Sequence, residues 1–231
     1  MMKYRIIFAF SVILAVLGLG ILSYSTVITW HNDRVHTATA REFYITATQI
    51  PYEEMNEHLL RAYEHNYHLH WISYNMGWRA FGYMAFVPED YAYILNVDGV
   101  LARLEIPLIN VDLPVRHGTA TETMLKGVGH LEGSSFPIGG YGTHTVMTAH
   151  SGMHNVTFFS RLHELEIGDT FYISTMGRRL AYRVDYIVVI LPHETEVLRI
   201  VPDADFASLI TCTPITVNTH RLVVRGARIP D

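Results

Sequence analysis

The sequence predicts a mainly β protein: a closed β-barrel with short helices, preceded by an N-terminal transmembrane helix and a helical segment. Three patterns predict this fold. They are an apolar run near the N-terminus, a stretch rich in helix formers, and, from Leu101 onward, short apolar runs separated by Gly, Pro, Asn and Asp. Many short strands with few crossover helices favour a barrel over a parallel α/β sheet. We therefore expect an anchor at residues 1–30, a helical and aromatic segment at 31–95, and the barrel at 96–231.

The first element is the apolar run from Ile6 to Leu22, in which Ser11 is the polar interruption, and weaker apolar character continues to Trp30. At helical rise this run is long enough to cross the hydrocarbon core of a bilayer. Lys3 and Arg5 precede it, which places the N-terminus in the cytoplasm. A cleaved signal peptide is the alternative, although no clean Ala-x-Ala site follows the run. In either case the residues after Trp30 face an extracytoplasmic space.

The second element lies between the anchor and about Asn96 and is rich in helix formers and aromatic residues. Pro51 suits the first turn of a helix. The apolar residues expected on one side of that helix are Met55, Leu59, Leu60 and Tyr63. We expect the segment to fold as helices lying on the barrel. An aromatic stretch follows, which we expect to pack beneath a long connection rather than to gate a substrate. Its members are Trp71, Tyr74, Trp78, Phe81, Tyr83 and Phe86.

The third element is a series of predicted strands, each a short apolar stretch with period-two alternation. The stretches are 101–106, 111–116, 143–149, 170–174, 180–191, 206–211 and 222–229. Short helical pieces fit between them at 121–126 and 158–165. The sequence contains no internal repeat and no low-complexity segment, so we expect one catalytic or binding domain.

The charge balance argues against one class of partner. The formal net charge is -5 and the sequence pI is about 6.3. Nucleic-acid binding requires a basic stripe that neutralises phosphates, and this chain has none. Nucleic acid is therefore not an expected partner.

The single cysteine, Cys212, is the first candidate for chemistry. Exported domains that use cysteine structurally use it in pairs, so a lone cysteine is either reactive or a small buried hydrophobe. Cys212 follows the apolar run 206–210 and precedes Thr213-Pro214, where a strand ends and a loop begins. A strand end gives a side chain a rigid base with access to a cleft. A thiol has a pKa of about 8.5, so a nucleophile here needs a nearby base or cation.

Two residues can supply that partner. His150 closes the predicted strand 143–149, and Arg221, nine residues after Cys212, opens the last strand. A short loop can return Arg221 beside Cys212, so three strand ends could converge on one edge of a barrel. In that arrangement Cys212 would be the nucleophile, His150 its acid/base partner and Arg221 the group that stabilises the oxyanion.

Three motifs resemble the sortase family of cysteine transpeptidases. Residues 208–212, Ser-Leu-Ile-Thr-Cys, are close to the sortase signature Thr-Leu-x-Thr-Cys. Residues 218–226, Asn-Thr-His-Arg-Leu-Val-Val-Arg-Gly, resemble the sortase arginine segment, and residues 142–150, Gly-Thr-His-Thr-Val-Met-Thr-Ala-His, resemble the histidine strand. Similarity to the pilus-building class C branch extends to residues 127–133, 155–165 and 168–172. The resemblance covers about 135 residues, from Asn96 to Pro230.

The resemblance implies a sortase β-barrel and a two-step acyl transfer. Cys212 would attack the Thr–Gly bond of a Leu-Pro-x-Thr-Gly-like sorting signal and form a thioacyl enzyme, which an amine then resolves. In class C the amine is a lysine of the next pilin subunit, so the implied function is pilus assembly. Attachment of surface proteins to a cell-wall peptide amine is the alternative. We expect substrate contacts at Leu209, Thr211 and Ser151, no cofactor and no metal, and a single-pass enzyme of the cell membrane with an extracellular catalytic domain.

The sequence departs from the class C pattern at several points. Class C sortases carry a lid with an Asp-Pro-aromatic motif, but the prolines before the barrel are Pro51 and Pro88 and neither follows Asp. We therefore expect an open or atypically gated site. The sequence ends at Asp231, where class C members commonly continue into a second membrane helix, so we expect either anchoring through the N-terminus alone or a shortened sequence. Ser208 replaces a threonine and keeps its hydroxyl. Residues 149–151, Ala-His-Ser, replace Gly-His-Arg and remove a positive charge.

The other histidines are expected to be structural. His144 and His150 share one face of a strand and His154 follows, but no carboxylate or second cysteine supports a metal site there. His220 should point to the face opposite the catalytic one. His130 is expected to support a Gly-rich loop.

Two functions of other classes fit the sequence less well. A cell-wall L,D-transpeptidase also uses one exported cysteine, and residues 117–119, His-Gly-Thr, weakly resemble its histidine segment. That family has glycine before the nucleophile, where this chain has Thr211. A non-enzymatic adhesion module would leave Cys212, His150 and Arg221 without a reason to fall at matching strand ends.

Overall fold

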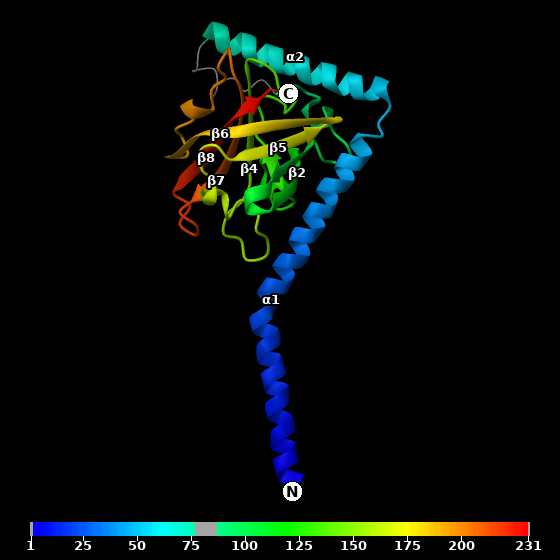
Figure 1. Ribbon diagram of the computed structural model, residues 1–231, viewed down its shortest axis with the longest axis vertical. Coiled ribbons are helices and arrows are strands. Elements are labelled where there is room, and N and C mark those ends of the chain that lie inside the picture. The colour runs from blue at the N-terminus through cyan, green and yellow to red at the C-terminus, as the bar shows by residue number, and fades with distance from the viewer. Residues whose placement is uncertain (1, 77–86, 231) are drawn as a thin grey trace.

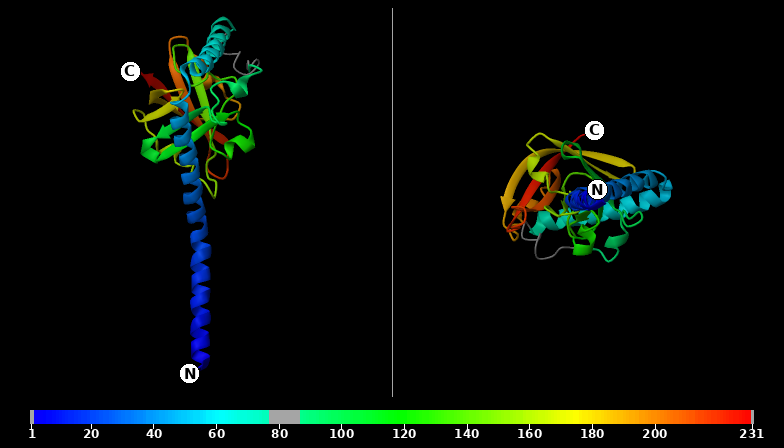
Figure 2. Two further views of the ribbon diagram at one scale, coloured as in Figure 1. Left: turned by 90° about the vertical axis from the view of Figure 1, so that its right-hand side faces the viewer. Right: turned by 90° about the horizontal axis from the view of Figure 1, so that it is seen from below.

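The computed structural model describes residues 2–76 and 87–230, in which two long helices accompany a β-barrel (Figure 1). Helix α1 (Met2–Ala47) continues without a break from the apolar run into the folded domain. Helix α2 (Tyr52–Met76) then crosses the opposite end of the barrel. Figure 2 shows the N-terminal part of α1 projecting alone from one end of the barrel. One helix therefore spans residue 30, where we placed the boundary between anchor and helical segment.

Eight strands among the described residues close into a barrel in the order β1-β2-β3-β4-β7-β8-β6-β5. Their bounds are Ala102–Ile106 (β1), Val111–His117 (β2), Val128–His130 (β3), Thr143–Thr148 (β4), Thr170–Thr175 (β5), Arg178–Ile190 (β6), Asp205–Thr213 (β7) and His220–Ile229 (β8). The pairs β2·β3 and β4·β7 are parallel, and the other neighbouring pairs are antiparallel. The closed barrel behind an apolar N-terminal helix confirms the predicted fold class.

The predicted strands all form, with ends within two residues of those expected. The sequence missed β3, because three residues with a central glycine are too few to show alternation. Of the two predicted helical pieces, the first forms as α4 (Thr121–Met124). The second, at 158–165, is absent except for the 3₁₀ turn η3 (Leu162–Glu164), and Phe158 has a left-handed φ of 36° that no helix tolerates.

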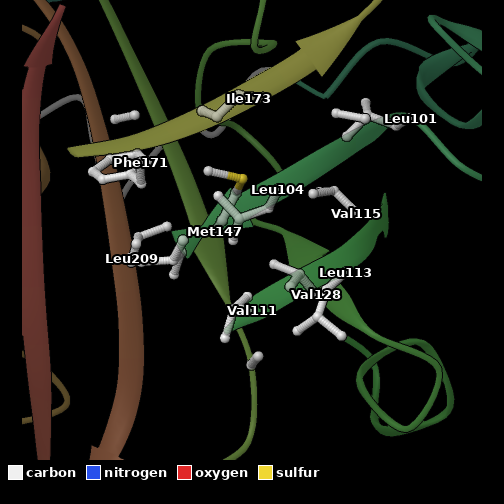
Figure 3. Close-up of a cluster of buried hydrophobic side chains, with 14 of the residues drawn as sticks. Leu101, Leu104, Val111, Leu113, Val115, Val128, Met147, Phe171, Ile173 and Leu209 are labelled. Atoms are coloured by element: carbon white, nitrogen blue, oxygen red, sulfur yellow. The ribbon is translucent and has the colours of Figure 1, made fainter. Parts of the chain in front are cut away.

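Apolar side chains from the inner faces of the strands fill the barrel. Leu104, Met147 and Leu209, from three different strands, lie in one cluster with Phe171 and Ile173 of β5 (Figure 3). All five are fully buried. Burying a side chain of this size stabilises a fold by about 1.5–3 kcal/mol. The core therefore fixes the relative positions of the strands that carry the candidate site.

One face of α2 packs on the barrel, and it matches the predicted apolar side only in part: Leu59 is buried and Met55 packs against the core, but the other two residues do not. Leu60 and Tyr63 are 53% and 41% exposed. The buried stripe instead includes Asn66, which donates to the Phe136 carbonyl at 3.0 Å and accepts from the Phe136 amide at 2.7 Å. The full stripe is Leu59, Ala62, His65, Asn66 and Leu69. An apolar pattern could not find it because two of its members are polar.

The aromatic stretch after this stripe does not pack as expected where it can be seen. Trp71 and Tyr74 are 53% and 72% exposed on α2. Neither residue belongs to the buried stripe of α2. The members Trp78, Phe81, Tyr83 and Phe86 lie outside the described residues.

Candidate active site

Cys212 lies one residue before the end of β7, a strand paired on both sides, with β4 and with β8. Successive side chains of a strand point to opposite faces. Leu209 therefore joins the barrel core, whereas Ile210 joins a second apolar cluster outside the wall. Cys212 shares the outer face with Ile210 and is partly exposed.

Backbone pairing places the three predicted catalytic residues at one level of the sheet. Cys212 pairs directly with Arg221 of the antiparallel strand β8. On the other side, Thr148 of the parallel strand β4 pairs with Ile210, so His150, two residues further on, is level with Cys212. Residues that pair directly present their side chains on the same face. The three side chains therefore belong to one rim of the barrel.

Hydrogen bonds hold the segment after β4 against the end of β7. The Ala149 N–H donates to a β7 carbonyl at 3.2 Å, and the Ala149 carbonyl accepts from the Thr211 hydroxyl at 2.8 Å. The Ser151 hydroxyl donates to the Cys212 carbonyl at 2.7 Å. Ala149 is buried on the inner face, so His150 between these two anchoring points faces outward. These hydrogen bonds of neighbouring residues, rather than a bond between the two side chains themselves, therefore keep His150 beside Cys212.

The Arg221 guanidinium is held by the loop that joins β7 to β8. Its Nη1 atom donates to the carbonyls of Asn218 at 3.1 Å and His220 at 2.9 Å. Within residues 2–76 and 87–230, no hydrogen bond joins the side chains of Arg221, His150 and Cys212 to one another. Catalytic hydrogen bonds are often long without substrate and tighten around it. A guanidinium anchored at one nitrogen keeps its other N–H groups for an oxyanion, so the rim can support nucleophilic acyl transfer.

The three residues predicted to contact substrate occupy different environments. Leu209 is fully buried in the core, and Thr211 is 4% exposed with its hydroxyl bonded within the wall. Both side chains therefore support the wall beneath the site rather than line its surface. Ser151 remains partly exposed on the rim.

Two buried histidines are structural in this fold. His144 bonds through both ring nitrogens, to the Arg199 carbonyl at 2.9 Å and the Ser208 hydroxyl at 2.8 Å, and burial lowers the pKa of His144 to about 4. His130 lies on β3 and not in a loop, because β2 and β4 both pair with it. It bonds the Tyr91 hydroxyl at 2.8 Å, and burial lowers the pKa of His130 to about 3. Both rings are therefore neutral at neutral pH.

The remaining histidines near the rim do not gather around His150. His154 is exposed on the loop after β4, and its carbonyl accepts hydrogen bonds from α1. A ring nitrogen of His220 bonds the neighbouring Thr219 hydroxyl at 2.9 Å. In the part of the chain that the structure describes, no group of three or more His, Cys, Asp or Glu residues could hold a metal ion.

The wall beside Cys212 is covered by a connection to which the sequence assigned no role. Between β6 and β7, the turn η4 (Glu196–Leu198) brings Leu198 against Val146, Ile210 and Val223. This outer cluster continues the face that ends in Cys212. Alternation along β7 was the available signal, since Ile210 and Cys212 share a face. The continuous apolar run hid that signal, because both faces of the strand are buried.

The predicted anchor has the surface that a lipid-facing helix requires. Helix α1 is, among the described residues, the one helix long and apolar enough to cross a membrane. None of its apolar window is buried inside the protein. Length and composition are therefore compatible with a single span near the N-terminus.

Comparison with known proteins agrees with this geometry. The family model described as the sortase domain matches residues 104–229. Sortase D of Bacillus subtilis (strain 168) is 29% identical over 129 residues, which cover 54% of this chain and 62% of that relative, so the chain spans less than two thirds of its length. The solved structure of sortase C-1 from Actinomyces oris is 48% identical, with a TM-score of 0.61, over 62% of this chain and 81% of that chain. Sortase C1 of GBS Pilus Island 1 is 38% identical, with a TM-score of 0.74, over 85% and 93%.

Proposed function

The chain belongs to the sortase family and is most like its class C members, and from this we propose that it is a cysteine transpeptidase. Cys212 is the nucleophile, His150 carries the proton and Arg221 stabilises the oxyanion. One observation carries the proposal: Cys212 pairs with Arg221 across β7 and β8, and His150 is level with both. This arrangement puts a thiol, an imidazole and a guanidinium on one partly exposed rim.

The reaction has two steps that share one intermediate. Cys212 Sγ, as the thiolate, attacks the threonine carbonyl carbon of a Leu-Pro-x-Thr-Gly-like signal, and an Arg221 N–H donates to the developing oxyanion. His150 gives its proton to the glycine amine as the C–N bond breaks, which leaves a thioester on Sγ. An acceptor amine then attacks the thioester carbon, His150 takes a proton from that amine, and Cys212 leaves as the thiolate. A donor at the oxyanion contributes about 3–4 kcal/mol in comparable sites.

The acceptor amine that we favour is a lysine of a pilin subunit. Support comes from the likeness to sortase C1 of GBS Pilus Island 1, which extends over 93% of that chain. Transfer to a cell-wall peptide amine is the second candidate, and the missing Asp-Pro lid motif favours it. The two acceptors would use the same thioester and differ only in the second step.

The location that we propose follows from helix α1. Residues 1–30 cross the cell membrane once, and the catalytic barrel, residues 96–231, acts outside it, with the pre-barrel segment 31–95 between them. Lys3 and Arg5 before the apolar run set this orientation.

The decisive experiment is intact-mass spectrometry of the detergent-solubilised full chain after mixing with sorting-signal peptides. We expect one thioacyl adduct on Cys212 and none with Cys212→Ala. The control Tyr141→Phe, at an exposed position on the far side of the barrel, should keep the adduct. An adduct that persists in Cys212→Ala would disprove the assignment. Adding a pilin or a wall-peptide amine then separates the acceptors, since only pilin polymerisation gives a high-mass ladder.

A further inference from the structure

Helix α1 sets the distance between the membrane and each part of the barrel that it contacts. A hydrocarbon core of about 30 Å requires about 20 residues at a helical rise of 1.5 Å. Counted from Ile6, which follows the basic residues Lys3 and Arg5, the core ends near Ser25. The helix continues unbroken to Ala47. The height of any group bonded to this helix above the lipid core can therefore be read from its sequence position.

The loop that follows His150 is bonded to α1 at the point where the core ends. The hydroxyls of Ser25 and Thr29 both donate to the His154 carbonyl at 3.2 Å. One turn further, Asn32 donates to the Asn155 carbonyl at 3.0 Å. The headgroup layer of each leaflet is about 5–7 Å thick, or about four residues of helix. His154 and Asn155 therefore lie at the height of the lipid headgroups.

A carboxylate one position beyond Asn32 fixes this height. Asp33 accepts from the Thr157 N–H at 3.0 Å and from the Thr157 hydroxyl at 2.6 Å. Four contacts spread over more than two turns of helix thus clamp one short loop. The loop cannot move along the helix without losing several of them.

A second loop lies at the same end of the barrel and, like the first, contains no charged residue. We define the anchor-side rim as loops 151–157 and 214–219, which both hang from the end where the free part of α1 leaves (lime and red-orange in Figure 1). Neither loop contains Asp, Glu, Lys or Arg. Val217 is 62% exposed at this rim. Uncharged surface with an exposed apolar side chain suits the membrane interface.

The opposite end of the barrel differs in charge. Its cavity of about 840 Å³ is lined by Arg178, Arg179, Arg228, Asp203 and Asp205, among others. The two ends of the barrel are thus chemically distinct, and the uncharged end is the one next to the anchor.

Aromatic side chains on α1 lie at both edges of the expected headgroup layer: Tyr24 is 68% exposed and Trp30 is 56% exposed. Tyr and Trp are enriched at membrane interfaces.

We propose that the anchor-side rim rests on the outer lipid headgroups, so that the proposed catalytic site opens at the membrane surface. The inference rests on the membrane anchor of the proposed function. Cys212 and Arg221 flank loop 214–219, and His150 precedes loop 151–157.

The test is depth-dependent fluorescence quenching of the full chain in vesicles of phosphatidylcholine and phosphatidylglycerol. Cys212→Ala removes the native thiol, and His154→Cys or Val217→Cys then accepts a bimane label. The matched control is Tyr141→Cys, which is 83% exposed just before the other end of β4. We expect headgroup-level doxyl lipid to quench positions 154 and 217 strongly and position 141 little. Equal quenching at positions 154 and 141 would overturn the proposal.

Two further measurements distinguish a failure of the membrane anchor from a failure of the rim to dock, and test whether α1 sets the height of the barrel. Vesicle flotation reports the anchor alone: a chain that does not float disproves the anchor, whereas one that floats without quenching at position 154 disproves only the docking. Four polar residues inserted after Leu22 would lift the barrel by about 6 Å. Quenching at position 154 should then fall, and undiminished quenching would show that α1 does not set the height.

Discussion

Arg221 owes its orientation to the loop carbonyls of Asn218 and His220, which hold one of its nitrogens. A planar guanidinium can keep these bonds while another N–H points to the substrate, whereas the ammonium of lysine is a point charge on a flexible stem. We predict that Arg221→Lys lowers kcat/KM by about 100-fold or more, the cost of one oxyanion donor. Peptide cleavage kinetics measure this effect, with the exposed Arg183→Lys as the matched control. Wild-type kinetics in Arg221→Lys would remove the oxyanion role.

Single residues were predictable where chemistry and strand position coincide. Cys212, His150 and Arg221 were each predicted to lie at a strand end, and the structure places them there, while their catalytic roles stay predictions. Residues whose surroundings come from distant segments were not predictable. His130 was placed in a loop because its strand partners, His117 and Met147, are 13 and 17 residues away in the sequence. Leu209 was expected to touch substrate, but only the closed barrel shows that its side chain faces the core.

At the scale of elements, the contact between α2 and the start of β4 depends on a missing side chain. Gly142 has φ of +73°, and a Cβ there would lie 2.1 Å from His70 Nδ1. Gly177 has a nearly identical φ of +72°, but its nearest neighbour would be Met55 Sδ at an ordinary 3.7 Å. A substitution by alanine would therefore strain the backbone at both positions but would add a steric clash only at Gly142.

We predict that Gly142→Ala destabilises the protein more than Gly177→Ala. Strain at positive φ costs about 1–2 kcal/mol in either variant, and the clash adds to it only at position 142. Denaturant unfolding monitored by near-UV circular dichroism measures both. Combining Gly142→Ala with His70→Ala should recover the difference between the two variants. Equal destabilisation by the two single substitutions would show that α2 yields freely at this point.

A helix or strand could be predicted where its own residues show the periodic apolar pattern of that element. The alternation of the long strands gave ends within two residues, whereas the short strand β3 has no period to read. The segment 158–165 has helical composition but is shaped by tertiary bonds, including that of Thr157 to Asp33 more than a hundred residues away. The buried face of α2 shifted because Asn66 satisfies the backbone of Phe136. A buried polar contact of that kind leaves no apolar signature in the sequence.

For the whole molecule, the fold buries two neutral histidines, His130 and His144, and this makes its stability depend on pH. Burial lowers the pKa of His130 to about 3 and that of His144 to about 4, from about 6.5 in the unfolded chain. Below pH 6.5 both rings therefore become protonated in the unfolded chain but stay neutral in the folded chain, so acid favours unfolding. Each ring lowers the free energy of unfolding by about 1.4 kcal/mol for every pH unit between pH 6.5 and its pKa in the folded chain.

We predict that the free energy of unfolding falls by about 2 kcal/mol per ring, about 4 kcal/mol together, between pH 8 and pH 5. Denaturant titrations of the full chain in detergent at several pH values measure the loss. The loss should set in near pH 6.5 and continue toward pH 4, where His144 begins to accept its proton in the fold. Substituting the exposed His193→Gln should leave the slope unchanged. A free energy that stays level down to pH 5 would mean that the barrel opens enough to protonate these rings without unfolding.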